Sequence, residues 1–251
     1  MHRLMASEPI ADTESRLAAA NGEVPILSTL PAAVRQRLID ASRLERFAPR
    51  AELFRDGELP RHLHIMLSGL VDLSCSYRGQ EYTAMMMAAG DVFMPAAALY
   101  AEPYLISAST LAPSRILMID AEVVRQEARD CSDLALSLAR VMAGQWRVAL
   151  KIILDLKCRS PSQRLAAFLL RLHDGAQPGP PAEIPFSKRQ LASRIGMQPE
   201  TLSRTLQTLA GNGLHLRGRQ IIITDRAAAE EFCGPDPYPP ASEYELGVHA
   251  L

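Results

Sequence analysis

Residues 187–213, which read SKRQLASRIGMQPETLSRTLQTLAGNG, decide the fold of the C-terminal part of the chain. Ser187 is a favourable N-cap for a short helix that carries Leu191, and Gly196 suits the left-handed turn that ends such a helix. Pro199 then starts a second helix, whose leucines recur on one face. Two short helices joined by a turn of three to four residues that contains Gly predict a helix-turn-helix.

The residues around this motif extend it into a winged form. The short apolar runs 214–216 and 221–223 flank Gly218, which predicts a two-stranded hairpin. Upstream, Ser160 is followed by Pro161 and, three positions on, by Gln163, which predicts a helix start with a capping box. We therefore expect a winged helix-turn-helix domain.

The charge of the chain is unevenly distributed. The whole chain has a net charge of −1, but the window 187–219 has six basic residues and one acid, Glu200, and so carries +5. The remaining 21 basic and 27 acidic residues give −6. A basic segment in an otherwise acidic chain is suited to bind phosphate groups. The six basic residues are Lys188, Arg189, Arg194, Arg204, Arg217 and Arg219.

The second helix of the motif has a polar face that could read DNA. Glu200, Ser203 and Arg204 are spaced i, i+3 and i+4, so they project together. In the major groove Arg can bind guanine O6 and N7, Glu can accept from cytosine N4, and Ser can bond either base or phosphate. The alternative is a solvated face with an intrahelical Glu200–Arg204 pair worth only ~0.3–0.5 kcal/mol. For phosphate contacts we expect Ser187, Lys188, Arg189, Gln198, Thr201, Thr205 and Arg217.

The N-terminal half has a different sequence pattern. From Leu44 to Asp120, short apolar runs alternate with turn signals such as Asp56-Gly57 and Gly90-Asp91, about every 10–12 residues. This spacing predicts an antiparallel β-sandwich or barrel. Ahead of it, Pro31 opens a helix with Val34, Leu38 and Ile39 at helical spacing, and behind it Asp120 caps another helix.

A longer helix is expected from about Ser132 to Lys157. It carries a 3-4-3-4 seam that is apolar except at Gln145, and such a seam is typical of a two-chain coiled coil. The alternative is a helix that merely packs on its own sandwich. The seam consists of Ala135, Leu138, Met142, Gln145, Ala149, Ile152 and Leu156.

Three blocks of sequence resemble the Crp/Fnr bacterial transcription regulators: SPSQRLAAF at 160–168, QLASRIG at 190–196 and PETLSRTLQTL at 199–209, with a looser match at 67–71. The resemblance covers about residues 25–232. It implies an α+β fold with an N-terminal antiparallel β-roll (jelly-roll, cyclic-nucleotide-binding-like) sensor domain, a long dimerisation helix and a C-terminal winged helix-turn-helix. It also implies a homodimer, and RNA polymerase as a further partner if the regulator is an activator.

The same resemblance suggests which DNA is read. Glu200, Ser203 and Arg204 match the E-x-x-S-R triplet of the Fnr-like branch, whereas the cyclic-AMP receptor branch has Gly at the position of Ser203. A palindrome resembling TTGAT, four unspecified bases and ATCAA is implied. Within that branch the chain is similar to the FixK-like and nitric-oxide-regulator-like members.

Two effectors of the family are disfavoured by the sequence. Family members that bind cyclic AMP hold its phosphate with an Arg-Ser or Arg-Thr pair, but residues 90–111 contain no Arg or Lys, and Ile106 stands at the Arg position. A buried phosphate needs a charged or backbone partner, so we do not expect cyclic AMP. The iron–sulfur cluster of Fnr needs N-terminal cysteines, and the first cysteine here is Cys75.

A haem-based gas sensor (nitric oxide or carbon monoxide) and a regulator without a ligand, as in the FixK-like branch, both stay open. His62 and His64 are candidate haem ligands, with His2 and Cys75 as further donors. The alternative is that these histidines are surface or hydrogen-bonded strand residues and that the methionines are core. An apolar, Met-rich effector pocket is expected from Met85, Met87, Phe93, Met94, Leu99 and Tyr100.

Composition excludes several classes of protein. The 251 residues are 48% hydrophobic and 22% charged, which is globular and not disordered. No apolar run of ~18 residues and no secretory signal is present, so we expect a cytoplasmic protein without a membrane partner. No nucleophile-elbow, zincin, P-loop or dinucleotide motif suggests an enzyme. A second function hypothesis is a ligand-binding sensor module whose helix-turn-helix contacts protein instead of DNA.

The expected domain boundaries follow from these patterns. They are a mobile arm at 1–23, a β-roll at 24–129, a dimerisation helix at 130–158, a winged helix-turn-helix domain at 159–232, and a flexible tail at 233–251.

Overall fold

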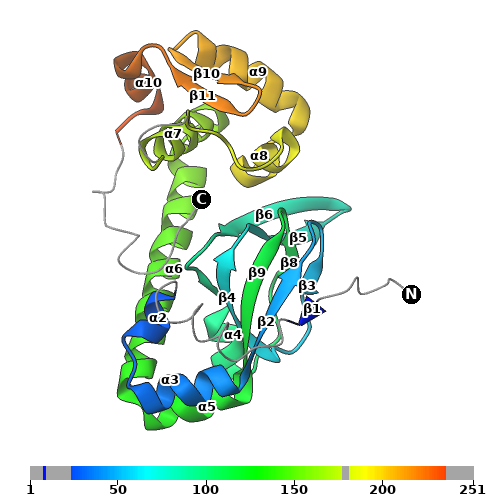
Figure 1. The fold of residues 1–251 in the computed structure, drawn as a ribbon. Helices are drawn as coiled ribbons and strands as arrows, with labels where there is room; N and C mark the ends of the chain where they lie inside the picture. The colour runs from blue at the N-terminus through cyan, green and yellow to red at the C-terminus, as the bar shows by residue number, and fades with distance from the viewer. Residues whose placement is uncertain (1–7, 10–23, 177–180, 236–251) are drawn as a thin grey trace. The chain divides into compact units, whose positions relative to one another are not determined.

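The computed structural model describes residues 8–9, 24–176 and 181–235, and it shows the expected α+β fold (Figure 1). The described residues form two compact units: residues 8–9, 24–76 and 84–148, and residues 77–83, 149–176 and 181–235. Apart from residues 8–9 and 233–235, the predicted arm and tail lie outside the described residues. No helix among the described residues combines the length and apolarity needed to cross a membrane.

The first unit contains two antiparallel sheets, as the 10–12-residue spacing of turns predicts. One sheet has the strand order β1-β2-β9-β4-β7 and the other β3-β8-β5-β6. In the first, β9 lies between β2 and β4 and pairs with both. The strands are β1 (Glu8–Pro9), β2 (Ser42–Phe47), β3 (Glu52–Phe54), β4 (His62–Ser68), β5 (Val71–Tyr77), β6 (Gln80–Met87), β7 (Val92–Phe93), β8 (Ser107–Thr110) and β9 (Ser114–Asp120).

Alternation along β4 builds two separate cores, because successive side chains of a strand point to opposite faces. Leu63, Ile65 and Leu67 belong to one buried cluster, whereas Met66 belongs to the other. The second cluster draws on strands of both sheets, from Phe54 of β3 to Met66 of β4, so it fills the roll interior.

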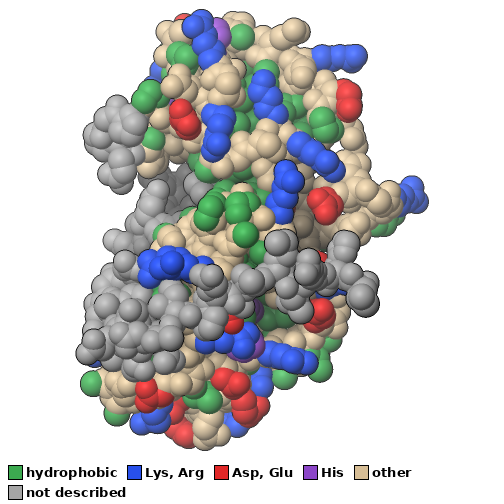
Figure 2. All heavy atoms as spheres, turned by 45° about the vertical axis from the view of Figure 1, so that its right-hand side comes forward, with side chains coloured by type: hydrophobic (Ala, Val, Ile, Leu, Met, Phe, Trp, Pro, Cys, Tyr) green, Lys and Arg blue, Asp and Glu red, His purple; other side chains and the backbone are tan. Residues whose placement is uncertain are grey.

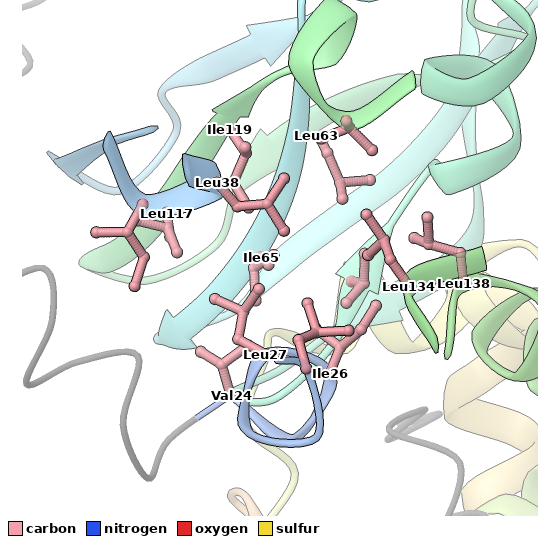
Figure 3. Packing of buried hydrophobic residues seen from close by; sticks show 14 of the residues in the cluster. Val24, Ile26, Leu27, Leu38, Leu63, Ile65, Leu117, Ile119, Leu134 and Leu138 are labelled. Carbon is pink, nitrogen blue, oxygen red and sulfur yellow. The ribbon is translucent and has the colours of Figure 1, made fainter. Parts of the chain in front are cut away.

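The first cluster joins the sheet to a layer of helices (Figure 3). Leu38 of α3, Val124 of α5 and Leu138 of α6 pack there, and α3 buries the residues predicted from its spacing. Asp120 caps α5 as predicted, with Oδ1 accepting from the backbone N–H of Glu122 at 2.8 Å. The helices of this part are α2 (Pro25–Ser28), α3 (Ala32–Asp40), α4 (Pro95–Tyr100), α5 (Ala121–Asp130) and α6 (Ser132–Cys158). Sequence patterns missed α2 and α4.

The second unit is a winged helix-turn-helix, with the caps and turn that the sequence predicts. Capping boxes begin α7 at Ser160 and α8 at Ser187, and Gly196 ends α8 with φ of 72°. The elements are α7 (Pro161–Asp174), α8 (Lys188–Ile195), α9 (Pro199–Ala210), β10 (Leu214–Arg217), β11 (Gln220–Ile223) and α10 (Arg226–Cys233). Helix α10 ends at Cys233, a buried residue, so the folded part extends past the predicted boundary at residue 232.

Gly213, between α9 and the wing, should not tolerate a side chain. Its φ is +75°, and a Cβ there would lie 2.6 Å from both Cβ and the carbonyl oxygen of Asp225. Gly213→Ala should lower the free energy of unfolding by about 3 kcal/mol, through backbone strain and overpacking. Gly218→Ala is the matched control, because Gly218 has φ of +63° but no atom within 4 Å of an added Cβ. It should cost only about 1 kcal/mol. Urea unfolding of the full chain measures both, and equal losses would contradict the steric argument.

Candidate nucleic-acid interface and sensor cavity

Helix α9 presents the predicted reading triplet to solvent. Glu200, Ser203 and Arg204 are all exposed, while Leu202 and Leu209 are buried and hold the helix against its domain. Within the part of the chain that the structure describes, no ion pair joins Glu200 to Arg204. The three polar side chains are therefore available together to a ligand, which weighs against an ordinary intrahelical pair.

Most of the residues predicted to contact phosphate are exposed too, and they lie at the start of α8, at the start of α9 and at the end of β10. The exposed residues are Ser187, Lys188, Arg189, Gln198, Thr201 and Arg217. Figure 2 shows Lys and Arg side chains spread over the face turned to the viewer. In the capping box, Ser187 Oγ accepts from the backbone N–H of Gln190 at 3.3 Å, and its hydroxyl also donates to Gln190 Oε1 at 2.9 Å.

Thr205 was predicted to contact phosphate, and this prediction is wrong. The residue is only 5% exposed, and its hydroxyl donates to the carbonyl oxygen of Thr201 at 2.9 Å. It lies three positions after Leu202 and four before Leu209, which places it on the buried face of α9. A Thr inside a helix commonly uses its hydroxyl in this way.

The arginines of the second unit have structural tasks that the sequence did not reveal. Arg164 Nε donates to the carbonyl oxygen of Ile195 at 3.2 Å, and this bond ties α7 to the end of α8. Burial lowers the pKa of Arg164. Arg194 lies over the ring of Phe168, 5.7 Å from its centroid. Part of the basic charge of the motif therefore holds the domain together.

An ion pair fixes the last helix of this unit. Arg226 donates to both carboxylate oxygens of Asp174 at 2.7 and 2.8 Å, joining α10 to α7. The hydrogen bonds from Arg226 hold the pKa of Asp174 below its usual range. Neither residue belongs to a motif, so the sequence carried no signal for this pair.

The structure engages two residues of the predicted seam of α6 within the chain itself, whereas Ala135 and Leu156 of that seam are exposed. Leu138 is 1% exposed and packs in the core of its own sensor domain, and Gln145 Nε2 donates to the carbonyl oxygen of Val92 at 2.5 Å. Neither side chain can lie in a seam between chains, so the predicted register is wrong there. The exposed side carries an apolar stripe with the same 3-4-3-4 spacing, formed by Leu136, Ala139, Ala143, Trp146, Leu150 and Ile153.

Of the six residues predicted to form a Met-rich effector pocket, four lie in or against one buried cluster and two lie elsewhere. Phe93 and Met87 are at most 2% exposed and fill the roll interior, where Met85 and Met94 pack against the same cluster. Leu99 packs against the other cluster, and Tyr100 is 76% exposed. Methionines fill irregular gaps in cores, and these residues act as packing.

A cavity of about 690 Å³ lies elsewhere in the roll, lined by residues of β2, β3, β4 and β9 and by loop residues near Glu58 and Tyr104. Both predicted histidines line it. His64 is 2% exposed, its ring lies 5.0 Å from that of Phe93, and its Nδ1 has no hydrogen-bond partner among the described residues. The cavity volume is within the range of small-molecule sites.

Burial makes His64 a neutral imidazole. Desolvation lowers its pKa from 6.5 to about 3, and nearby His62 and Arg43 add to this effect. Between these two pH values the unfolded chain binds more protons than the folded chain, so stability falls as the pH falls.

We expect this single residue to cost about 2 kcal/mol of stability between pH 7 and pH 5. His64→Phe keeps an aromatic ring and removes the titration, so the free energy of unfolding of that variant should fall by about 2 kcal/mol less over the same interval. Urea unfolding of both proteins at the two pH values measures the difference. Parallel pH dependence would show that His64 is not buried as a neutral group.

A roll-shaped sensor domain, a long helix and a winged helix-turn-helix in one chain define a class of DNA-binding transcription regulators with a ligand-sensing domain. The cyclic nucleotide-binding domain model matches residues 44–131, and the Crp-like helix-turn-helix domain model matches residues 163–232. The chain belongs to the Crp/Fnr family.

Relatives and solved structures agree with this assignment. The CRP-like cAMP-activated global transcriptional regulator of Mycobacterium tuberculosis is 26% identical over 179 residues, which are 69% of this chain and 80% of the relative. The nitrogen fixation regulation protein FixK of Azorhizobium caulinodans is 25% identical over 191 residues, or 72% and 75% of the two chains. The structure of FixK2 from Bradyrhizobium japonicum matches 78% of this chain and 98% of its own, with 20% identity and a TM-score of 0.69, and so shows the same fold.

Proposed function

We propose that this protein is a homodimeric, sequence-specific regulator of the Fnr-like branch that reads a palindrome resembling TTGAT, four unspecified bases and ATCAA. The carrying observation is the exposed triplet Glu200, Ser203 and Arg204, which has no ion pair between its Glu and Arg in the described chain. Arg pairs with guanine O6 and N7, and Glu accepts from cytosine N4. The protein carries out no catalysis in this role.

The dimer forms along the apolar stripe of α6. Trp146 is 64% exposed and Leu136 is 52% exposed in the single chain, and large apolar side chains in a row at heptad spacing are typical of a two-chain seam. A second copy related by a two-fold axis would bury the same stripe. It would also present two reading helices to half-sites one DNA turn apart, ~34 Å.

A gel shift with the full chain tests the proposed function. The palindrome and a duplex with the same bases in scrambled order are titrated side by side at physiological salt. We expect at least ~1,000-fold tighter binding to the palindrome, the lower end for specific regulators. Absence of any shift would instead favour the second hypothesis, a helix-turn-helix that contacts protein.

For the effector we propose that cyclic AMP has no role here, although one relative is named as cAMP-activated. The reason is the lack of any Arg or Lys in residues 90–111 to pair with a buried phosphate. If the regulator activates transcription, RNA polymerase is its further partner, and transcription in vitro from a promoter carrying the palindrome tests this.

Haem is a candidate effector. His62 and His64 line the same cavity with their ring centroids 6.2 Å apart, and the neutral imidazole of His64 is the kind of group that would hold haem iron. A bound haem would supply an iron that binds a diatomic gas. A Soret band in anaerobically purified protein, or in the protein after haem is added, supports haem as the effector. If neither measurement shows a Soret band, haem is ruled out.

A further inference from the structure

The cavity beside β4 has an aromatic floor and a charged mouth. Phe54, His64 and Tyr104 are each at most 5% exposed, and the rings of Phe54 and Tyr104 are stacked with centroids 3.8 Å apart. Arg43 and Arg61, which also line the cavity, are exposed. A ligand that fits such walls has a flat apolar body and a polar end.

The floor contains a polar atom with an unmet hydrogen bond. His64 Nδ1 is buried and has no partner among the described residues, although buried polar groups in proteins are nearly always paired. His64 lines the cavity, but its Nδ1 has less than 1 Å² of accessible surface, so a ligand would meet Nδ1 only when the ring of His64 turns toward it. A hydroxyl group suits this position, since it can either donate or accept.

The charged side chains at the mouth of the cavity determine which ligand charge is favoured. Arg43 is paired with Glu45 at 2.6 Å, whereas Arg61 has no ion pair among the residues that the structure describes. With Arg43 balanced by Glu45, the remaining charged groups of the lining are Arg61 and Glu58, and Glu58 accepts a hydrogen bond from the backbone N–H of Arg55 at 3.1 Å. Burial lowers the pKa values of the lining histidines His62 and His64 and keeps them neutral. A single carboxylate on the ligand would pair with Arg61, the guanidinium of the lining that has no ion pair among the described residues.

We propose that the cavity binds a monoanionic aromatic acid, with its carboxylate at Arg61, its ring against Phe54 and Tyr104, and a polar group at His64. This inference rests on the proposed role of the roll as a sensor and names the class of its effector. Arginine binds carboxylates through charge-assisted hydrogen bonds, which are the stronger kind. A ligand with two carboxylates, such as haem, would leave one of its charges without a free guanidinium.

The test uses three matched two-ring probes and the full chain without DNA, so its result does not depend on DNA reading. The probes are 6-hydroxy-2-naphthoate, its neutral amide 6-hydroxy-2-naphthamide, and 2-naphthoate, which lacks the hydroxyl. Calorimetric titration should show the hydroxy acid binding at least ~10-fold tighter than the amide, the effect of one charge-assisted hydrogen bond. It should also bind several-fold tighter than 2-naphthoate.

Two variants assign the contacts. Arg61→Gln should weaken the hydroxy acid ~10-fold and leave the amide unchanged. His64→Phe should remove the preference for the hydroxyl, so that the hydroxy acid and 2-naphthoate bind alike. Arg46→Gln is the matched control, because Arg46 is exposed on β2 but does not line the cavity. It should change none of the three affinities.

Three outcomes would overturn the proposal. The first is that the hydroxy acid does not bind at ~1 mM, with thermal unfolding used to show that the protein is folded. The second is that the acid and the amide bind with equal affinity. The third is stoichiometric haem uptake that is lost in His64→Phe, which would assign the cavity to haem. A normal gel shift alongside any of these would leave the DNA-binding proposal standing.

Discussion

Arg204→Ala should abolish most of the discrimination between the palindrome and a scrambled duplex. Each Arg204 that bonds a guanine contributes ~1–3 kcal/mol, and a dimer makes the contact twice, so affinity for the palindrome should fall by roughly 30-fold or more. Affinity for the scrambled duplex should change little, because a base contact adds nothing there. Arg204 is exposed, so the substitution leaves the core of the domain intact.

Lys188→Ala is the matched control for this experiment. Lys188 is also exposed and basic, at the first position of α8, but we assign it to phosphate. Its loss should weaken both duplexes alike and reduce the salt dependence of binding. If Arg204→Ala behaves in the same way as Lys188→Ala, Arg204 does not read a base.

Leu150→Glu should convert the dimer into a monomer. Leu150 lies between Trp146 and Ile153 in the exposed apolar stripe of α6, and in a two-fold dimer the substitution would bury two unpaired carboxylates. The loss of apolar burial and the cost of desolvation together amount to about 4 kcal/mol or more, a ~1,000-fold increase in the dimer dissociation constant. Sedimentation velocity at micromolar concentration measures the change, and binding to the palindrome should fall with it.

Ala149→Glu separates the two registers of this helix. Ala149 belongs to the seam predicted from sequence but flanks the exposed stripe, at a position where coiled coils tolerate Glu. The Ala149→Glu variant should remain a dimer. Dissociation of Ala149→Glu together with a stable Leu150→Glu dimer would restore the register predicted from sequence.

Local signals in the sequence predicted the helix-turn-helix almost in full. Capping residues, Pro at a first helical turn and Gly at a left-handed turn act over a few residues, so Ser187, Pro199 and Gly196 lie where the pattern placed them. The same holds for Asp120 before α5. The exposed side of α9 followed directly from the spacing of its leucines, and only Thr205 was placed on the wrong face.

The features that were missed depend on contacts between distant residues. In α6 apolar residues occupy most positions, so two seams one residue apart fit the same sequence. Packing of Leu138 in the sensor core decides which side stays exposed. The cavity is a similar case, because Arg43, Phe54, His64 and Tyr104 come from separate segments. No spacing rule joins them, and β-roll topology alone brings them together.

The contact between Arg204 and a guanine is tested most directly by a double-mutant cycle between protein and DNA. Wild-type protein and Arg204→Ala are each titrated with the palindrome and with a palindrome whose half-site G·C pair is replaced by A·T. The base change should cost wild-type protein ~1–3 kcal/mol per half-site more than it costs Arg204→Ala, which can lose only the contact of Glu200 with the cytosine of that pair. An equal cost in both proteins would contradict base reading by Arg204.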